Sequence, residues 1–133
     1  MHYTALVHKD PDSEYGVSFP DFPGCIAVGS SIGEAMNSAM QALSFHVHGM
    51  VADGEIIPEP RPTDQILSDP DFVEDLEGAT LVLIPLVRDL GSTTRINVSL
   101  DLGLLEAIDA AARQRKQTRS AFIASAVRKE LTA

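Results

Sequence analysis

The most regular alternation of polar and apolar residues lies near the C-terminal end of the chain. Residues 93–100 alternate strictly, which is typical of a strand with two unlike faces. The apolar face would hold Ile96, Val98 and Leu100. A lone strand is unstable in water, so this one needs a partner strand, and a second copy of the chain is the simplest supplier.

Two segments with helical periodicity follow that strand. The first runs from about Leu102 to Gln114 and has Asp101 as a suitable N-cap. The second runs to about Leu131, and we expect Ser120 to be its N-cap. Both helices are short and would be marginal alone, but two strands and four helices from two chains could close one core. The predicted dimer core comprises Ile96, Val98, Leu100, Leu105, Ile108, Phe122, Ile123 and Val127.

The N-terminal half of the chain predicts a small sheet and one long helix. Strands are expected over residues 3–8, 15–19 and 25–28, and the first two would form a hairpin. A helix is expected from about Ile32 to Val47, with Ser31 or Ser30 as its N-cap and Glu34 placed to complete a capping box on Ser31. Together with the C-terminal segments, this pattern indicates an α+β protein.

Between residues 49 and 79 the periodicity is lost, apart from a possible helical turn over residues 71–76. Residues 80–87 are continuously apolar, as in a central strand buried on both faces, although Pro85 places the end of that strand near an edge or a bend. We predict two domains, residues 1–90 and residues 91–133.

Charge is divided unevenly between these two parts. The whole chain has a formal net charge of −9. Residues 92–133 hold seven Lys and Arg against four Asp and Glu, whereas residues 1–91 hold three against fifteen. This asymmetry suggests separate roles: a basic end suited to DNA and an acidic end suited to a basic protein.

Composition limits the cellular setting. The chain has 133 residues, no apolar run near the ~20 residues of a membrane span, and no signal-peptide pattern at its start. Its one cysteine, Cys25, permits no intrachain disulfide. We therefore expect a cytoplasmic protein.

The C-terminal segments resemble a ribbon-helix-helix DNA-binding domain. The resemblance rests on the run RINVSL over residues 95–100 and the run TRSAFI over residues 118–123. In that family two strands pair antiparallel across a dimer and enter the major groove. The resemblance implies that Arg95, Asn97 and Ser99 read bases, with Thr93 at the strand's edge, and that Arg119 and Ser120 hold a phosphate at the helix N-terminus. The alternative is a helical hairpin that only dimerises.

The N-terminal half resembles HicB-type antitoxins, from the first strand to about Pro60. Its most specific part is the run FPDFPGC over residues 19–25, supported by Gly29 and by Glu34. The resemblance implies a partial ribonuclease-H-like domain, the antitoxin role of a type II toxin–antitoxin pair, and a HicA-type toxin partner, a small basic ribonuclease that cuts messenger RNA. It also implies repression of the antitoxin's own operon through operator DNA, by a dimer or possibly a tetramer. The acidic stretch 64–79 has no specific role in this interpretation.

Residues that could carry chemistry are few. A nuclease would need several carboxylates around magnesium, and the candidates are Asp10, Asp12, Glu14 and Asp21. The first three lie in a hairpin turn and the fourth lies in a proline-rich loop, so we expect no enzyme activity.

Metal and cofactor sites are not expected either. His46 and His48 are two residues apart, a poor spacing for chelation on a helix, and Cys25 has no basic neighbour in sequence. A stand-alone DNA-binding repressor whose N-terminal domain senses a ligand is the alternative function. The operator sequence, the residues that contact the toxin, and the oligomeric state beyond a C-terminal dimer stay open.

Overall fold

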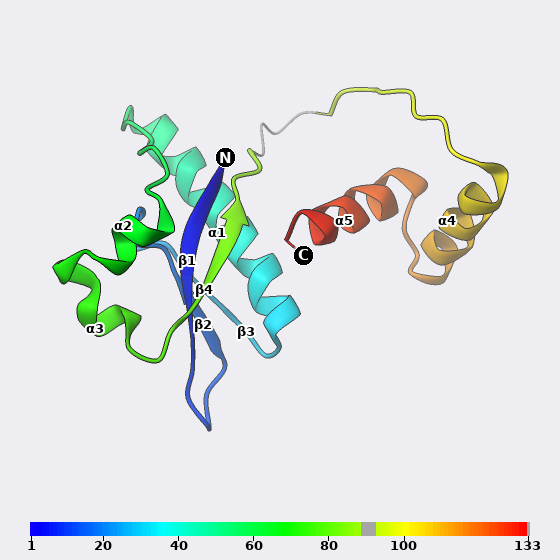
Figure 1. The fold of residues 1–133 in the computed structure, drawn as a ribbon. Helices are drawn as coiled ribbons and strands as arrows, with labels where there is room; N and C mark the ends of the chain where they lie inside the picture. The colour runs from blue at the N-terminus through cyan, green and yellow to red at the C-terminus, as the bar shows by residue number, and fades with distance from the viewer. Residues whose placement is uncertain (89–92, 133) are drawn as a thin grey trace. The chain divides into compact units, whose positions relative to one another are not determined.

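The computed structural model describes residues 1–88 and 93–132, which fall into two compact units (Figure 1). The N-terminal unit holds residues up to 88, and the C-terminal unit holds residues 93–131. The boundary predicted between residues 90 and 91 lies outside the described residues.

The N-terminal unit is a four-stranded antiparallel sheet with helices on both sides. In chain order its elements are β1 His2–Lys9, β2 Tyr15–Ser18, β3 Ile26–Gly29, α1 Ile32–Ala52, α2 Thr63–Leu67, the 3₁₀ turn Pro70–Phe72, α3 Val73–Leu76 and β4 Thr80–Pro85. The strand order is β3-β2-β1-β4. In this register Leu6 faces Ser18 on one side and Leu81 on the other, so β1 is a central strand.

Helix α1 packs on one face of this sheet because its buried side chains recur at helical spacing. Alternate residues of β1 point toward it and form the core with the loop residue Phe22, whose ring lies 4.7 Å from that of Tyr3. The fully or nearly fully buried core residues are Tyr3, Ala5, Val7, Val17, Phe19, Phe22, Cys25, Ala35, Ala39, Met40, Leu43, Val47 and Ile84.

The start of α1 is fixed by its cap and by a glycine. Ser31 is the N-cap, as predicted, and its Oγ accepts from the amide of Glu34 at 3.1 Å. The Glu34 carboxylate accepts a hydrogen bond from the Ser30 hydroxyl, whereas the predicted capping box would pair it with the amide of Ser31. A Cβ on Gly29 would lie 2.3 Å from the backbone nitrogen of Ala35, so only glycine lets β3 end this close to the helix. The helix ends at Ala52, five residues beyond its predicted end.

The opposite face of the sheet is partly covered by the segment from α2 to α3 (Figure 1). Thr4 Oγ1 shares a hydrogen bond of 3.0 Å with Thr63 Oγ1, and His8 Nε2 lies 2.7 Å from the carbonyl oxygen of Asp75. The helical turn expected over residues 71–76 is present as the 3₁₀ turn and α3. The sequence pattern gave no sign of α2.

The strand β4 differs from its prediction. It is an edge strand rather than a central one, and Leu83 is 58% exposed. Only its last two residues, Ile84 and Pro85, are buried, and of these Ile84 belongs to the core. The continuous apolar run was misleading because the segment from α2 to α3 covers only part of the outer face.

The C-terminal unit is a helical hairpin of α4 Leu102–Gln114 and α5 Arg119–Thr132. Asp101 caps α4 as predicted, accepting from the amide of Leu104 at 2.9 Å. The cap predicted for α5 is wrong. Thr118, not Ser120, accepts from an amide of the first turn, that of Ala121, at 3.1 Å. The chain reverses at Lys116, which has a φ of 55°, and the helix can begin two residues earlier than expected.

Residues 93–100 form no strand ladder within the single chain that the structure describes. The predicted strand therefore has no partner here. A strand is defined by pairing, so the strand over residues 93–100, and the second chain expected to pair with it, stay predictions.

Candidate functional site

The alternating run 93–100 is exposed on both faces. Its polar side chains, Thr93, Arg95, Asn97 and Ser99, are all exposed. Its apolar side chains are also exposed, Ile96 at 74%, Val98 at 66% and Leu100 at 39%. Exposed apolar residues that share one face of an extended segment are typical of an interface, so the predicted dimer core stays a prediction that these exposures favour.

The helical hairpin of one chain buries its apolar side chains only in part. The remaining predicted core residues Leu105, Ile108, Phe122 and Ile123 are half-buried, and Val127 is 52% exposed. The Phe122 ring packs under the guanidinium of Arg115, whose carbon lies 5.3 Å from the ring centroid.

One predicted phosphate-binding residue is held by an ion pair. Arg119 Nε and Nη2 donate to the two carboxylate oxygens of Asp109 at 2.8 and 2.9 Å, which links α5 to α4. The hydrogen bond from Arg119 and its charge lower the pKa of Asp109 below its usual value. The guanidinium is therefore positioned by α4, whereas Ser120 lies exposed in the first turn of α5.

The loop after β2 contains an interaction that the sequence analysis missed. The side chain of Asp21 is only 2% exposed, and its carboxylate accepts from Arg61 Nε at 2.6 Å and from the Arg61 amide at 3.2 Å. Arg61 also contacts Asp69 at 3.2 Å and the Pro20 carbonyl at 3.2 Å, and its guanidinium carbon lies 5.1 Å from the Phe72 ring centroid. The available signal was that Arg61 is the one basic residue between Lys9 and Arg88.

The four candidate nuclease carboxylates do not lie together in one site. Asp21 is bound to Arg61, and Asp10, Asp12 and Glu14 lie exposed around the β1–β2 turn. Within residues 1–88 and 93–132, His, Cys, Asp and Glu form no group of three that could hold a metal ion. His46 instead packs edge-on against Phe22 at 5.9 Å.

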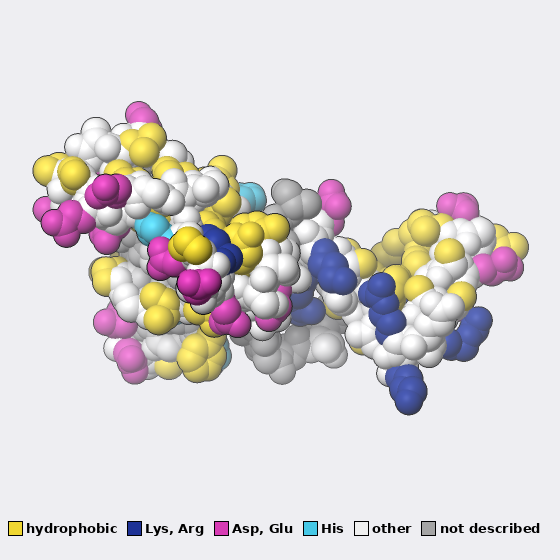
Figure 2. All heavy atoms as spheres, turned by 90° about the horizontal axis from the view of Figure 1, so that it is seen from below, with side chains coloured by type: hydrophobic (Ala, Val, Ile, Leu, Met, Phe, Trp, Pro, Cys, Tyr) yellow, Lys and Arg dark blue, Asp and Glu magenta, His cyan; other side chains and the backbone are white. Residues whose placement is uncertain are grey.

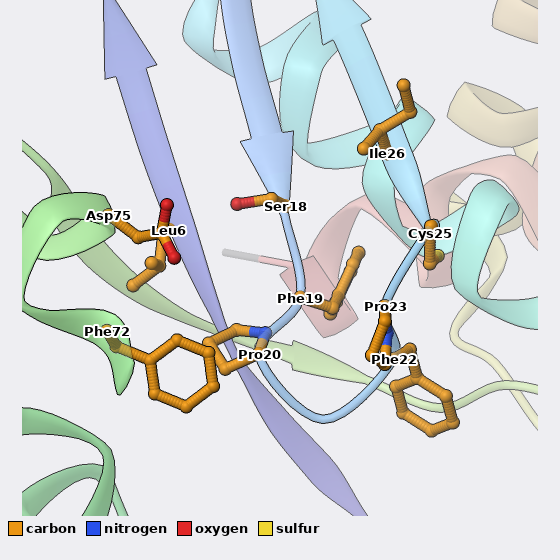
Figure 3. A pocket seen from close by; sticks show the side chains of 11 residues that line it. Leu6, Ser18, Phe19, Pro20, Phe22, Pro23, Cys25, Ile26, Phe72 and Asp75 are labelled. Atoms are coloured by element: carbon orange, nitrogen blue, oxygen red, sulfur yellow. The ribbon is translucent and has the colours of Figure 1, made fainter. Parts of the chain in front are cut away.

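A groove of about 240 Å³ opens on the side of the sheet away from α1 (Figure 3). Leu6 and Ser18 lie between its two walls, which are Phe72 and Asp75 on one side and the 20–24 loop on the other. Ile26, which is 70% exposed, extends this surface along β3. Cys25 also lines the groove but is buried, and burial raises the pKa of its thiol to about 11. The thiol is therefore protonated at neutral pH and unsuited to be a nucleophile.

The surfaces of the two units differ in charge. Figure 2 shows carboxylates gathered over the N-terminal unit and Lys and Arg over the C-terminal unit. The N-terminal unit is therefore acidic and has an open groove. The C-terminal unit is basic and begins with the alternating segment 93–100, which forms no strand pair in the described chain.

Comparison with known proteins gives a consistent result along most of the chain. The family described as "HicB_like antitoxin of bacterial toxin-antitoxin system" matches residues 3–127. A protein of Haemophilus phage HP1, described as an uncharacterized 14.9 kDa protein in the rep-hol intergenic region, is 36% identical over 109 residues, 82% of this chain and 80% of its own length.

Two further proteins carry a name. Antitoxin HicB of Escherichia coli K12 is 34% identical over 85 residues, which cover 63% of this chain and 59% of that protein. The crystal structure of the Burkholderia pseudomallei antitoxin HicB superposes with a TM-score of 0.56 at 32% identity and covers 98% of both chains. The N-terminal domain of the Burkholderia protein also has a crystal structure of its own.

Proposed function

The chain belongs to the HicB-like antitoxin family of bacterial toxin–antitoxin systems, and from that premise we propose that it is the antitoxin of a type II pair. In this proposal the N-terminal domain, residues 1–90, binds a HicA-type toxin and covers its active surface. The C-terminal domain, residues 91–133, binds operator DNA as a ribbon-helix-helix dimer and represses the antitoxin's own operon.

The division of charge carries this proposal. Residues 1–88 hold fourteen Asp and Glu against three Lys and Arg, which attracts a basic ribonuclease and repels nucleic acid. A toxin surface that binds RNA is itself basic, so an acidic antitoxin can occupy the surface that RNA needs. Inhibition is then occlusion and requires no chemistry from the antitoxin.

The exposed segment 93–100 supports the DNA-binding part. Pairing two copies antiparallel would bury Ile96 and Val98, which are 74% and 66% exposed in one chain. The same pairing places Arg95 and Asn97 together on the outer face, where both types of side chain read purine edges in the major groove. Ser99 and Thr93 complete that face.

The first turn of α5 is suited to hold a DNA phosphate. Thr118 already satisfies the amides of Ala121 and Phe122, through Oγ1 at 3.1 Å and through its carbonyl at 3.0 Å. We assign the two preceding amides, those of Arg119 and Ser120, to the phosphate. Because the Arg119 guanidinium is already paired with Asp109, we expect the two backbone amides to contribute more than this side chain to phosphate binding.

The partly ribonuclease-H-like character of the N-terminal domain is what the resemblance to HicB-type antitoxins implies, and an antiparallel sheet with α1 across one face is compatible with it. We infer that the domain has lost any catalytic use, because Asp21 is occupied by Arg61. No helix in the described parts of the chain is long and apolar enough to cross a membrane. We also propose a cytoplasmic location, because both proposed partners, a ribonuclease of messenger RNA and operator DNA, would be found there.

A repressor that senses a small ligand is the competing function. The groove of about 240 Å³ is open and falls below the roughly 300–1,000 Å³ of ordinary ligand pockets. Its exposed extension along β3, at Ile26 and Val28, is better suited to a protein surface.

The proposal is tested by co-expression with the genes that flank this one in its native host. One flanking gene should encode a small basic protein that arrests growth, and co-expression of this chain should restore growth. The purified chain should also retain the DNA upstream of its own gene. Growth arrest by no flanking gene, together with normal DNA binding, would favour the ligand-sensing repressor.

A further inference from the structure

The face of the sheet away from α1 is covered over β1 but open toward β3. The strand register aligns Leu6, Ser18 and Ile26 in one row across this face. Leu6, on β1, is 1% exposed, whereas Ile26, on β3, is 70% exposed. Val28 lies two residues along β3 on the same face and is 58% exposed. The row therefore leads through the groove of about 240 Å³ to an uncovered apolar edge (Figure 3).

Arg61 fixes the distance between the two walls of this groove. On the side of the 20–24 loop, it donates to the Asp21 carboxylate at 2.6 Å and to the Pro20 carbonyl oxygen at 3.2 Å. On the other side, its guanidinium carbon lies 5.1 Å from the centroid of the Phe72 ring. Because one residue contacts both walls, the groove is preformed, which spares a partner the cost of ordering it.

The groove combines an apolar lining with one carboxylate. Leu6 and Phe72 contribute apolar surface, and Asp75 is the one charged residue among the described residues that line it. The side chains of Lys and Arg have the same division, because a long apolar stem ends in a cation. An apolar cavity of roughly 150 Å³ accommodates benzene, so a groove of about 240 Å³ is wide enough for one such side chain.

We infer that this groove is the docking site for a Lys or Arg side chain of the basic toxin, which rests on the antitoxin function proposed above. The stem of that side chain lies against Leu6 and Phe72, and its cation pairs with Asp75. Beside the groove, Ile26 and Val28 pack against apolar residues of the toxin. The face of the sheet away from α1 is then the surface that occludes the toxin.

Charge around the groove identifies a basic protein as the occupant. Residues 62–87 hold six acidic side chains and no Lys or Arg, whereas residues 35–52 of α1 hold no charged side chain at all. A basic partner is therefore drawn to the groove side of the sheet rather than to α1. A nucleic acid or a second acidic unit would be repelled there. The six acids are Asp64, Asp69, Asp71, Glu74, Asp75 and Glu77, all exposed except the half-buried Asp69.

The test measures, by isothermal titration calorimetry, the affinity of the full-length chain for the small basic protein encoded beside its gene. Ser18→Phe fills the groove from its floor with a side chain that suits a strand. Asp75→Lys reverses the charge of the groove. Each change should weaken binding at least ~10-fold. Asp12→Lys makes the same change of charge in the exposed β1–β2 turn and should weaken binding less than ~3-fold.

Urea denaturation followed by tyrosine fluorescence separates lost binding from a lost fold, and all three variants should unfold near the wild-type midpoint. Wild-type affinity in both Ser18→Phe and Asp75→Lys would overturn the inference but leave the antitoxin function intact. Equal losses in Asp75→Lys and Asp12→Lys would also overturn it, because overall charge alone would then govern binding. If the wild type bound no basic protein encoded beside its gene, the proposed function itself would fail, and the inference with it.

Discussion

Removal of Arg61 should destabilise the N-terminal unit more than any other single loss of a basic residue in it. The Asp21 carboxylate is 2% exposed and accepts from the guanidinium at 2.6 Å, so Arg61→Ala leaves a buried charge with one backbone amide as partner. The change also removes the contacts with Asp69 and the Phe72 ring.

The magnitude follows from the burial of each partner. Removing one member of a buried ion pair costs about 3–5 kcal/mol, and the 28% exposure of Arg61 places this pair at the lower end because water reaches one side. The pair with Asp69, whose side chain is 24% exposed, adds at most about 1 kcal/mol. We therefore expect Arg61→Ala to lower the free energy of unfolding by about 3 kcal/mol.

Urea denaturation followed by tyrosine fluorescence measures this effect selectively. The chain has no tryptophan, and both of its tyrosines, Tyr3 and Tyr15, lie in the N-terminal unit. Arg88→Ala, a matched loss of an exposed arginine in the same unit, should change stability by less than about 0.5 kcal/mol.

A second change distinguishes a buried charge from lost packing. Arg61→Ala leaves the buried Asp21 carboxylate without its cationic partner, and Asp21→Asn removes that negative charge. The double variant should therefore be more stable than Arg61→Ala alone. The reasoning would be refuted if the double variant lost as much stability as Arg61→Ala, or as much as the two single variants together. Either result would mean that burying the unpaired Asp21 carboxylate costs no free energy.

Four further predictions concern the rest of the chain. Replacing both Arg95 and Asn97 with Ala should abolish operator binding in a gel-shift assay but leave toxin binding unchanged; undiminished DNA affinity would contradict their role as base readers. A chain ending at Arg88 should lose DNA binding yet still neutralise the toxin in a growth assay, and failure to neutralise while folded would show that the C-terminal domain serves both tasks. Phe122→Ala should cost about 3–5 kcal/mol if the dimer buries the ring completely, whereas a loss below about 1 kcal/mol in denaturation of the assembled protein would place it outside the core. Because burial raises the pKa of the Cys25 thiol to about 11, alkylation by iodoacetamide at neutral pH should be slow in the folded chain and fast after unfolding; rapid labelling of the native protein would contradict this.

Local signals in the sequence were sufficient for most elements. The cap at Asp101 and the apolar spacing after it predicted α4 with its observed bounds, since both cause and effect lie within a few residues. The alternation and turn residues near the N-terminus similarly located β1, β2 and β3. The failures were of a different kind. Thr118 and Ser120 can both cap a helix, and the choice between them depended on the reversal at Lys116.

Long-range contacts account for what sequence could not predict. The strand β4 was expected in the centre of the sheet, but the position of a strand depends on which neighbours pair with it, and β4 pairs only with β1. The Asp21–Arg61 pair joins residues forty positions apart. No local pattern encodes such a contact. The pairing predicted for residues 93–100 would involve a second chain, so one folded chain does not test it.

The most direct test of the antitoxin assignment is an affinity pull-down of the tagged chain from its native host, with mass spectrometry of the proteins that co-purify. The account predicts one small basic protein at near-equal stoichiometry, released by high salt more readily than by mild detergent, because charge complementarity brings the partners together. Recovery of the chain with its DNA but without a protein partner would contradict the account and favour a repressor that acts alone.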